Sequence, residues 1–222
     1  MQSKTEKVIY VDGFKIRNTL DTDFTVLHRR TDSIAGYAPK YFIPHGEIWI
    51  DNQFRLEADF FVEIDNFLIE HENLPYLEAR ELAKTIICPK GPIPNFRLKE
   101  EFNEEGQKIV NVDGSVIRKY IDPDFVFGGH EFVYDYVPEN EIWLDALMDP
   151  MEVKYVLEHE KLERTLMSKG EIYDIAHEFA TTLERKLRRD DGLASYPGDA
   201  DYPWKGLTTR EIINDYYYVT GQ

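Results

Sequence analysis

The pattern of apolar and polar positions divides the chain into two similar series, each with strand-like segments first and helix-like segments afterwards. Short stretches of alternating apolar and polar residues, typical of half-buried strands, end at Glu47–Asp51 in the first series and at Glu141–Asp145 in the second. Apolar residues spaced by three and four positions, typical of helices, follow each of these strands. Strands followed by helices in both series predict an α+β fold.

The clearest helical spacing lies in residues 171–189 of the second series. Its regularly spaced apolar residues are Ile172, Ile175, Ala176, Phe179, Leu183 and Leu187. A preceding helical pattern begins near Pro150 and runs to Met167, where Ser168–Gly170 breaks it. We therefore expect two consecutive helices that form a hairpin, with one face of the second helix buried.

The two series also share sequence motifs in the same order. Val11–Arg17 and Asp21–Phe24 recur as Val112–Arg118 and Asp122–Phe125, with the same spacing between them. Each Asp-Gly pair in these motifs is expected to form a turn after a strand, not a phosphate-binding loop. Tryptophan is rare in the chain, yet one stands in each of the matching Glu-Ile-Trp strands. We therefore predict two tandem copies of a small strand-rich unit followed by a helical hairpin.

Four segments follow from this repeat. Residues 8–88 form the first copy, and residues 109–190 form the second copy. Residues 89–108, which are rich in proline and charged side chains, are expected to connect them. In the tail, residues 191–222, the capping box Thr208–Glu211 predicts a short aromatic helix that docks against the body.

The composition excludes several functional classes. The 42 acidic and 26 basic side chains give a formal charge of −16, which repels phosphate backbones, so we expect no nucleic-acid partner. The single cysteine, Cys88, cannot form an intramolecular disulfide. No apolar run approaches the length of a membrane span, and no signal-peptide pattern begins the sequence. We therefore expect a cytoplasmic protein without membrane contact, whose partner is a protein or peptide.

One group of residues in the second copy suggests metal chemistry. His159 and Glu163 lie four positions apart, so they project from the same face of the first hairpin helix. The turn brings His177 of the second helix level with them, and two imidazoles with one carboxylate are a usual ligand set of catalytic zinc. Glu160 occupies the position of the general base in H-E-x-x-H enzymes. Such pairs on one helix are also common as solvated ion pairs, and His177 is the observation that favours a metal.

Other side chains are expected to support this group. Ala176 and Ala180 allow a close approach of the two helices, and Glu184 could orient an imidazole from behind. His130, in an expected loop, either lines the same pocket or serves only as a surface or hydrogen-bonding group. Asp145, at the end of its strand, is a weaker candidate for contact with the site.

The second copy resembles a known group of proteins in these motifs. The H-E-x-x-E run from His159 to Glu163 and the A-H-x-x-A run around His177 are similar to those of largely uncharacterised phage and bacterial proteins of zincin-like type. The resemblance covers about residues 110–190. It implies a metallopeptidase-like architecture with His159, Glu163 and His177 as metal ligands and Glu160 as base. Glu163 stands where zincins carry a second histidine.

The first copy lacks the corresponding ligands. A gapless alignment of the two hairpins places Val62, Asn66 and Arg80 at the three ligand positions and retains only a glutamate, Glu63, at the position of the base. A register that instead aligns His71 with the first ligand histidine needs a gap and supplies no second histidine. We therefore expect the first copy to be a scaffold that binds no metal.

These observations lead to one expected function and one alternative. The expected function is that of a zinc-dependent hydrolase of metallopeptidase type, which acts on a peptide or amide bond with Glu160 as its catalytic base. The alternative is a non-enzymatic structural or protein-interaction protein, for example one encoded by a phage, in which a structural or vestigial metal site braces the hairpin. Metal content and the effect of replacing Glu160 distinguish the two.

Overall fold

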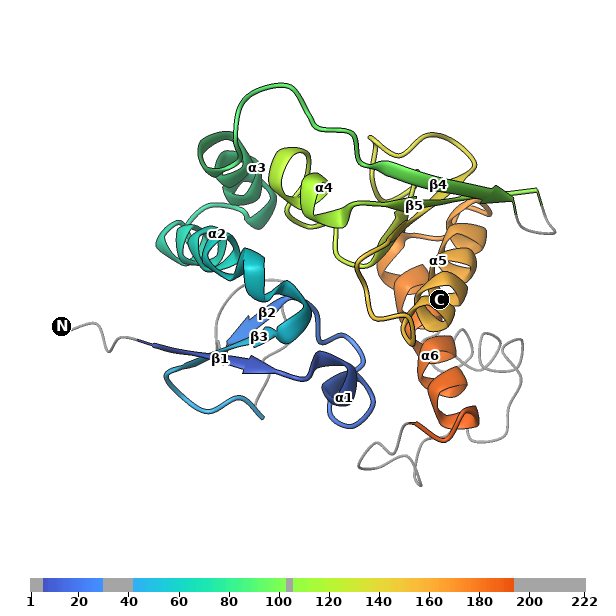
Figure 1. The fold of residues 1–222 in the computed structure, drawn as a ribbon, viewed down its shortest axis with the longest axis horizontal. Helices are drawn as coiled ribbons and strands as arrows, with labels where there is room; N and C mark the ends of the chain where they lie inside the picture. Colours follow the sequence, from blue (N-terminus) through green and yellow to red (C-terminus); the bar gives the residue numbers. More distant parts are fainter. Residues whose placement is uncertain (1–5, 30–41, 103–105, 194–222) are drawn as a thin grey trace.

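The fold was obtained as a computed structural model, which describes residues 6–29, 42–102 and 106–193 (Figure 1). These residues form two sheets with seven strands in total, six α-helices and one short 3-10 helix, so the predicted α+β class is confirmed. None of the described helices is long and apolar enough to cross a bilayer. The short helix expected in the tail falls outside the described residues.

The first sheet has the strand order β1-β3-β2. Its middle strand pairs in parallel with β1 and antiparallel with β2. The strands are β1 (Lys7–Val11), β2 (Leu27–Arg29) and β3 (Glu47–Asp51). The accompanying helices are α1 (Gly13–Arg17), the 3-10 helix η1 (Asn52–Glu57), α2 (Ala58–Glu70) and α3 (Tyr76–Ile87).

The second sheet repeats this arrangement and adds one strand at its edge. Its order is β4-β5-β7-β6, with β5 parallel to β7 and β6 antiparallel to β7. The strands are β4 (Arg97–Phe102), β5 (Lys108–Val112), β6 (Gly128–His130) and β7 (Glu141–Asp145). The helices are α4 (Gly114–Tyr120), α5 (Val153–Met167) and α6 (Tyr173–Asp190). The added strand β4 lies within the segment expected to be a connector.

The two sheets agree in register as well as in order. Val11 pairs with Asp51 in the first sheet, and Val112 pairs with Asp145 in the second. Each parallel pair is connected through a short helix and an antiparallel strand that comes to lie on the far side of the central strand. The same order and pairing of strands therefore occur among the described residues of 6–87, here called the first half, and in residues 108–190, the second half.

The Asp-Gly pairs begin helices, so the prediction of turns at these positions was wrong. Asp12 caps α1 by accepting a hydrogen bond from the Lys15 amide at 2.9 Å. Asp113 caps α4 by accepting from the Ser115 amide at 3.1 Å. An aspartate that accepts hydrogen bonds from amides two or three residues later suits both a turn and a helix N-terminus, and the local sequence does not separate the two.

A common apolar core joins the two halves. Its buried side chains from the first half are Val26, Ile48, Ile50, Phe54, Ala58 and Phe61. Those from the second half are Ile109, Phe127, Ile142, Leu144, Met148 and Val156. Because these side chains pack in one cluster, the two sheets and the first helix of each hairpin are held against each other by apolar burial.

Two buried arginines add reciprocal ion pairs across the same interface. Arg17 of the first half contacts Asp51 of its own sheet at 2.8 Å and Glu152 of the second half at 2.6 Å. Arg118 of the second half contacts Asp145 of its own sheet at 2.7 Å and Glu57 of the first half at 2.9 Å. Each half thus contributes one arginine that forms an ion pair with a glutamate of the other half. Such an exchange is typical of an interface with two-fold symmetry.

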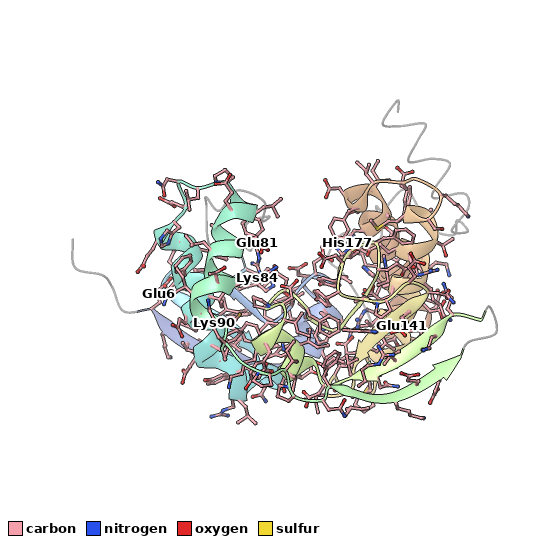
Figure 2. All side chains as sticks on the ribbon, turned by 90° about the horizontal axis from the view of Figure 1, so that it is seen from above. Glu6, Glu81, Lys84, Lys90, Glu141 and His177 are labelled. Carbon is pink, nitrogen blue, oxygen red and sulfur yellow. The ribbon has the colours of Figure 1, made fainter. Side chains whose placement is uncertain are left out.

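The two helical hairpins stand on opposite sides of a cleft of about 910 Å³. Figure 2 shows this arrangement, with Lys84 on the α3 side and His177 on the α6 side. The cleft is lined by side chains of α2, α3, α5 and α6 and by β2 and β6. The fold therefore places the hairpin of the second half, with its histidines, on one wall of a cavity that both halves build.

Candidate metal centre

The hairpin of α5 and α6 forms as the sequence predicts. α5 ends at Met167, and Gly170 adopts a φ of +97°, a left-handed conformation that favours glycine and lets the chain reverse. Ala176 and Ala180 are both 0% exposed. Their small side chains allow α6 to pack closely against α5, which brings residues of the two helices into contact.

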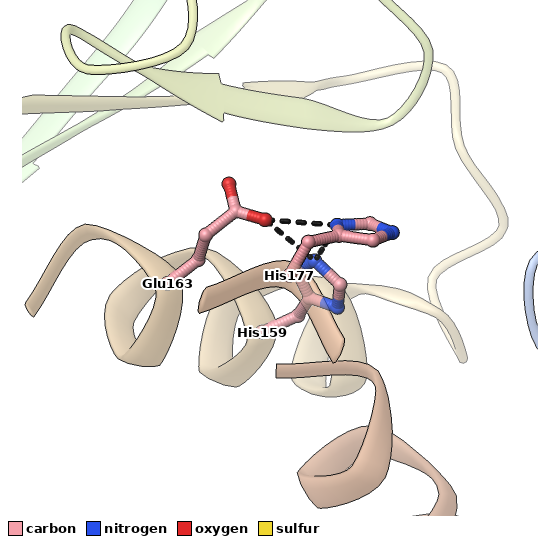
Figure 3. Close-up of side chains that lie close together, drawn as sticks. All are labelled: His159, Glu163 and His177. Atoms are coloured by element: carbon pink, nitrogen blue, oxygen red, sulfur yellow. Dashed lines mark hydrogen bonds and ion pairs between the residues drawn. The ribbon is translucent and has the colours of Figure 1, made fainter. Parts of the chain in front are cut away.

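The three predicted ligands converge in this hairpin (Figure 3). The Nε2 atom of His159 lies 3.3 Å from Nδ1 of His177. The Oε2 atom of Glu163 lies 2.8 Å from Nδ1 of His177 and 3.5 Å from Nε2 of His159. Ligand atoms about 2.0–2.1 Å from a tetrahedral zinc ion lie about 3.3–3.4 Å apart, so a zinc ion fits among these three atoms with small adjustments.

The site is buried on one side and open on the other. Glu163 is 3% exposed and His159 is 9% exposed, whereas the His177 side chain is 37% exposed. All three line the cleft. A cation held by them would therefore face the cleft with its remaining coordination position, as in zinc sites that act on a substrate.

Glu184 orients His159 from behind, as expected from the sequence. Its Oε2 lies 3.1 Å from Nδ1 of His159, which turns the Nε2 atom of the ring toward Glu163 and His177. Burial alone would raise the pKa of Glu184, but contacts with His159 and Arg188 lower it to about 2. A histidine backed by an ionised carboxylate is the usual arrangement of a metal-binding imidazole.

His130 lies against Glu163 on the side away from the other two candidate ligands' contacts with Oε2. Its Nε2 lies 3.2 Å from Oε1 of Glu163, and its Nδ1 accepts a hydrogen bond from the Phe132 amide at 3.3 Å. Because Nδ1 accepts this hydrogen bond, Nε2 is the ring nitrogen that carries a proton, and it lies beside Glu163. Among the described residues Nε2 of His130 has no hydrogen-bond partner of regular geometry, and it lies against Oε1 of Glu163 and leaves Oε2 for the ligand position.

His130 is completely buried at the end of β6, so it is a buried hydrogen-bonding group behind Glu163, neither a surface residue nor one of the side chains that line the cleft. The sequence left these two readings open, because the strand that carries His130 is only three residues long and has no apolar pattern. Burial would raise the pKa of Glu163, but the three surrounding histidines lower it well below its usual range. The Glu163 carboxylate is therefore already ionised before it binds a cation.

Glu160 lies beside this group without being one of its three ligands. It is 8% exposed, and one of its carboxylate oxygens lies within 4.8 Å of ligand atoms of His130 and Glu163. A Cβ at Gly128 would lie only 3.0 Å from Cγ and Oε1 of Glu160, so the glycine makes room for this side chain against β6. Burial first, and then the charge of Glu163, raise the pKa of Glu160 to about 8.

The first half faces the cleft with a different set of α2 residues from the one that the gapless alignment predicts. Val62 is half-buried, Glu63 and Asn66 are exposed, and none of them lines the cleft. The α2 side chains that line it are Phe61, Ile64, Asp65 and Leu68. The corresponding side chains of α5 are Val156, His159, Glu160 and Glu163, with the same spacing along the helix.

The gapless register is therefore wrong for α2, where Ile64 and Leu68 face the cleft as His159 and Glu163 do from α5. It agrees with the structure in the second helix of the hairpin, because Arg80 lines the cleft from α3 as His177 does from α6. Helix length explains the difference. α5 continues for more residues after Glu163, its last cleft-lining residue, than α2 does after Leu68. None of the cleft-lining residues of α2 and α3 forms a group of three ligand side chains with its neighbours.

Comparisons of the chain with models of protein families, with curated proteins and with solved structures found no match, so the chemistry of this site is inferred from its own geometry.

Proposed function

We propose that the chain binds one zinc ion through His159, Glu163 and His177. The observation that carries this proposal is the set of distances of 2.8–3.5 Å between one atom of each residue, on two helices that meet at buried alanines. One carboxylate, Glu184, fixes the orientation of His159, and one histidine, His130, lies against Glu163. A buried carboxylate surrounded by imidazoles gains most from a cation, because burial without one is costly.

We further propose that this centre hydrolyses a peptide or amide bond. Zinc bound there would supply a Lewis acid that polarises a carbonyl group in the cleft. Glu160 accepts a proton on its carboxylate from the attacking water and passes it to the leaving amine. Its pKa of about 8 in the metal-free protein suits this exchange, because general acid–base catalysis works best with a pKa near the working pH.

The cleft is the proposed substrate site. Its volume of about 910 Å³ is within the usual range for small-molecule and cofactor pockets and admits several residues of a peptide. The zinc ligands lie on the α5 and α6 wall, and Phe61, Ile64 and Leu68 give the opposite wall an apolar character. A peptide bound between them would present one of its carbonyl groups to the metal.

The chain is also proposed to be a duplicated unit whose second copy is zincin-like. Support comes from the matching strand registers and from the arginine that each half gives to the other. In this proposal residues 8–88 are a scaffold copy and residues 109–190 carry the chemistry. The apolar residues on the α2 wall agree with a copy that binds no metal.

A comparison of Glu160→Gln with the wild-type protein tests the hydrolase. Both proteins are loaded with zinc and incubated with a mixture of unfolded proteins and short peptides, and the products are identified by mass spectrometry. Glu160→Gln should keep its zinc and lose about 10²–10⁴-fold in rate, the usual contribution of a general acid or base. Glu158→Gln is the matched control, because Glu158 lies on the same helix but pairs only with Lys161 in the described contacts.

Wild-type protein that holds zinc but cleaves none of these substrates would contradict the hydrolase. It would favour the alternative of a structural or protein-interaction protein in which zinc braces the hairpin. Equal rates for Glu160→Gln and Glu158→Gln would remove Glu160 from the mechanism.

A further inference from the structure

A continuous series of buried charges leads from the proposed zinc site to the other half of the molecule. It begins at Glu184, which contacts His159 through Oε2 and receives hydrogen bonds from Arg188 on Oε1, at 2.5 Å from Nη2 and 3.1 Å from Nε. The Arg188 side chain is 0% exposed, so its charge is balanced by protein groups and not by water.

The series continues through Glu152 into the first half. Nη2 of Arg188 also contacts Oε2 of Glu152 at 2.5 Å, and Oε1 of the same carboxylate accepts a hydrogen bond from Nε of Arg17 at 2.6 Å. Arg17 in turn contacts Asp51, at the end of β3, at 2.8 Å. Glu152 is completely buried and Arg17 is 2% exposed. Five charged groups of alternating sign thus connect β3 with the histidine.

The charge of Glu152 affects how firmly Glu184 holds the ring of His159, because both glutamates contact Arg188. Arg188 is shared between the two glutamates, and each of them uses only one oxygen for it. If Glu152 lost its charge, Glu184 would become the remaining carboxylate partner of a buried guanidinium, and charge-assisted hydrogen bonds of this kind are strong. Glu184 would then be drawn toward Arg188 and would hold the Nδ1 proton of His159 less firmly.

We propose that the first half, which carries no ligand, sets the zinc affinity of the second half through Arg17 and Glu152. Arg17 and Glu152 are positioning residues in this scheme, because they act on the metal only through Arg188, Glu184 and His159. The inference rests on the zinc site proposed above. It assigns to the metal-free half a part in binding in addition to its packing role.

The molecule contains a matched control for this proposal. Arg118 makes the reciprocal contacts, at 2.7 Å to Asp145 and at 2.9 and 3.0 Å to the two oxygens of Glu57. It is as deeply buried as Arg17, at 1% exposure. Among the described residues Glu57 contacts Arg118, and this contact leads to no histidine. Loss of Glu57 should therefore weaken the interface without affecting the metal.

The test is a zinc titration of the full chain as wild type, Glu152→Gln and Glu57→Gln, in competition with a chromophoric chelator at a temperature at which all three are folded. Glu152→Gln should bind zinc about tenfold more weakly, at the lower end of the roughly 10–100-fold effect of losing a residue that contacts a ligand directly, because Glu152 acts only through Arg188 and Glu184. Glu57→Gln should bind zinc within about threefold of wild type. Cobalt in place of zinc gives a second readout, because its visible spectrum should change in Glu152→Gln and not in Glu57→Gln.

The outcomes separate this inference from the proposed function. A wild-type chain that binds no zinc would overturn the zinc site itself. A wild-type chain that binds zinc while Glu152→Gln and Glu57→Gln have equal affinity and equal cobalt spectra would overturn the inference alone. If Glu152→Gln does not fold, Arg17→Lys and Arg118→Lys form the second pair, and the same comparison of zinc affinity decides.

Discussion

Ala83 of α3 and Ala180 of α6 lie at the same distance in sequence from the tyrosine that begins each helix, and both are almost fully buried, at 1% and 0% exposure. Each of them lets the second helix of its hairpin pack against the first. The two hairpins therefore use the same close contact, although only the contact at Ala180 lies beside a group of ligand side chains.

Replacing either alanine with leucine should destabilise the protein by about 1–3 kcal/mol, because extra methylene groups in a packed contact force the helices apart. Urea denaturation measures this loss. Ala180→Leu should also weaken zinc binding at least about tenfold, since His177 and His159 lie on the separated helices, and Ala83→Leu should not. A similar loss of zinc affinity in both variants would show that general loosening, not hairpin geometry, controls the site.

Zinc affinity should rise with pH. Burial lowers the pKa of His159, but its contacts with the Glu163 and Glu184 carboxylates outweigh this and raise the pKa well above its ordinary value. The metal must therefore displace a proton from His159, and this displacement becomes easier as the pH rises toward the raised pKa. Calorimetry in buffers of different ionisation enthalpy should detect proton release at neutral pH.

Glu160 adds to this proton release, because its pKa of about 8 keeps it mostly protonated at neutral pH in the metal-free protein. Glu160→Gln should therefore release fewer protons than wild type and still release those of His159. Zinc binding that is independent of pH and releases no proton would contradict the described contacts of His159.

Glu141 should contribute to stability in a defined acid range. Burial would raise its pKa, but hydrogen bonds from Arg97, Trp143 and Lys108 lower it from 4.5 to about 2. A carboxylate with a lowered pKa in the folded state stabilises the protein above its unfolded value, and the benefit is lost as the pH falls toward the folded value. Glu141→Gln should therefore be less stable than wild type at neutral pH, and the difference should shrink between about pH 4.5 and pH 2.

Glu47 provides the control for this measurement, because it makes the same bond to a tryptophan, Trp49, at 2.8 Å but is less buried. Glu47→Gln should change acid stability less than Glu141→Gln does. Thermal unfolding at a series of pH values compares them, and parallel curves for wild type and Glu141→Gln would exclude this role of Glu141.

Gly13 and Gly114 should not tolerate alanine. A Cβ at either position would overlap the carboxylate of Asp51 or Asp145, which holds the buried arginine of its own half. We expect each substitution to cost about 1–3 kcal/mol in urea denaturation, as overpacking usually does. The exposed Lys119 of α4 is the reference site, where alanine should change stability by less than about 0.5 kcal/mol. Equal stability of Gly114→Ala and Lys119→Ala would rule out the tight contact.

The candidate ligands could be found from the sequence because their placement depends on local geometry. His159 and Glu163 share a helix face through the helical repeat, and Gly170 fixes the position at which α6 turns back. The end of α5 can be recognised in the sequence, because Ser168–Gly170 contains residue types that terminate helices. The alternation of strand and helix patterns predicted the α+β class in the same way.

The residues that the sequence placed less well depend on contacts between distant segments. His130 reaches Glu163 only because β6 lies at the edge of the second sheet, and a three-residue strand leaves no alternation to detect. The contact of Arg17 with Glu152 joins residues 135 positions apart. The register of α2 depends on which of its faces the common core covers, and a gapless alignment of the two hairpin sequences does not reveal this face.

Zinc binding by the full chain tests the account most directly. The protein is purified without a histidine tag, freed of metal, and titrated with zinc against a chromophoric chelator. We predict one zinc per chain, lost in the double variant His159→Ala, His177→Ala and retained in His71→Ala, whose histidine lies at the end of α2 in the other hairpin. Wild-type protein that binds no stoichiometric zinc, or a double variant that binds it as wild type does, would contradict the metal centre.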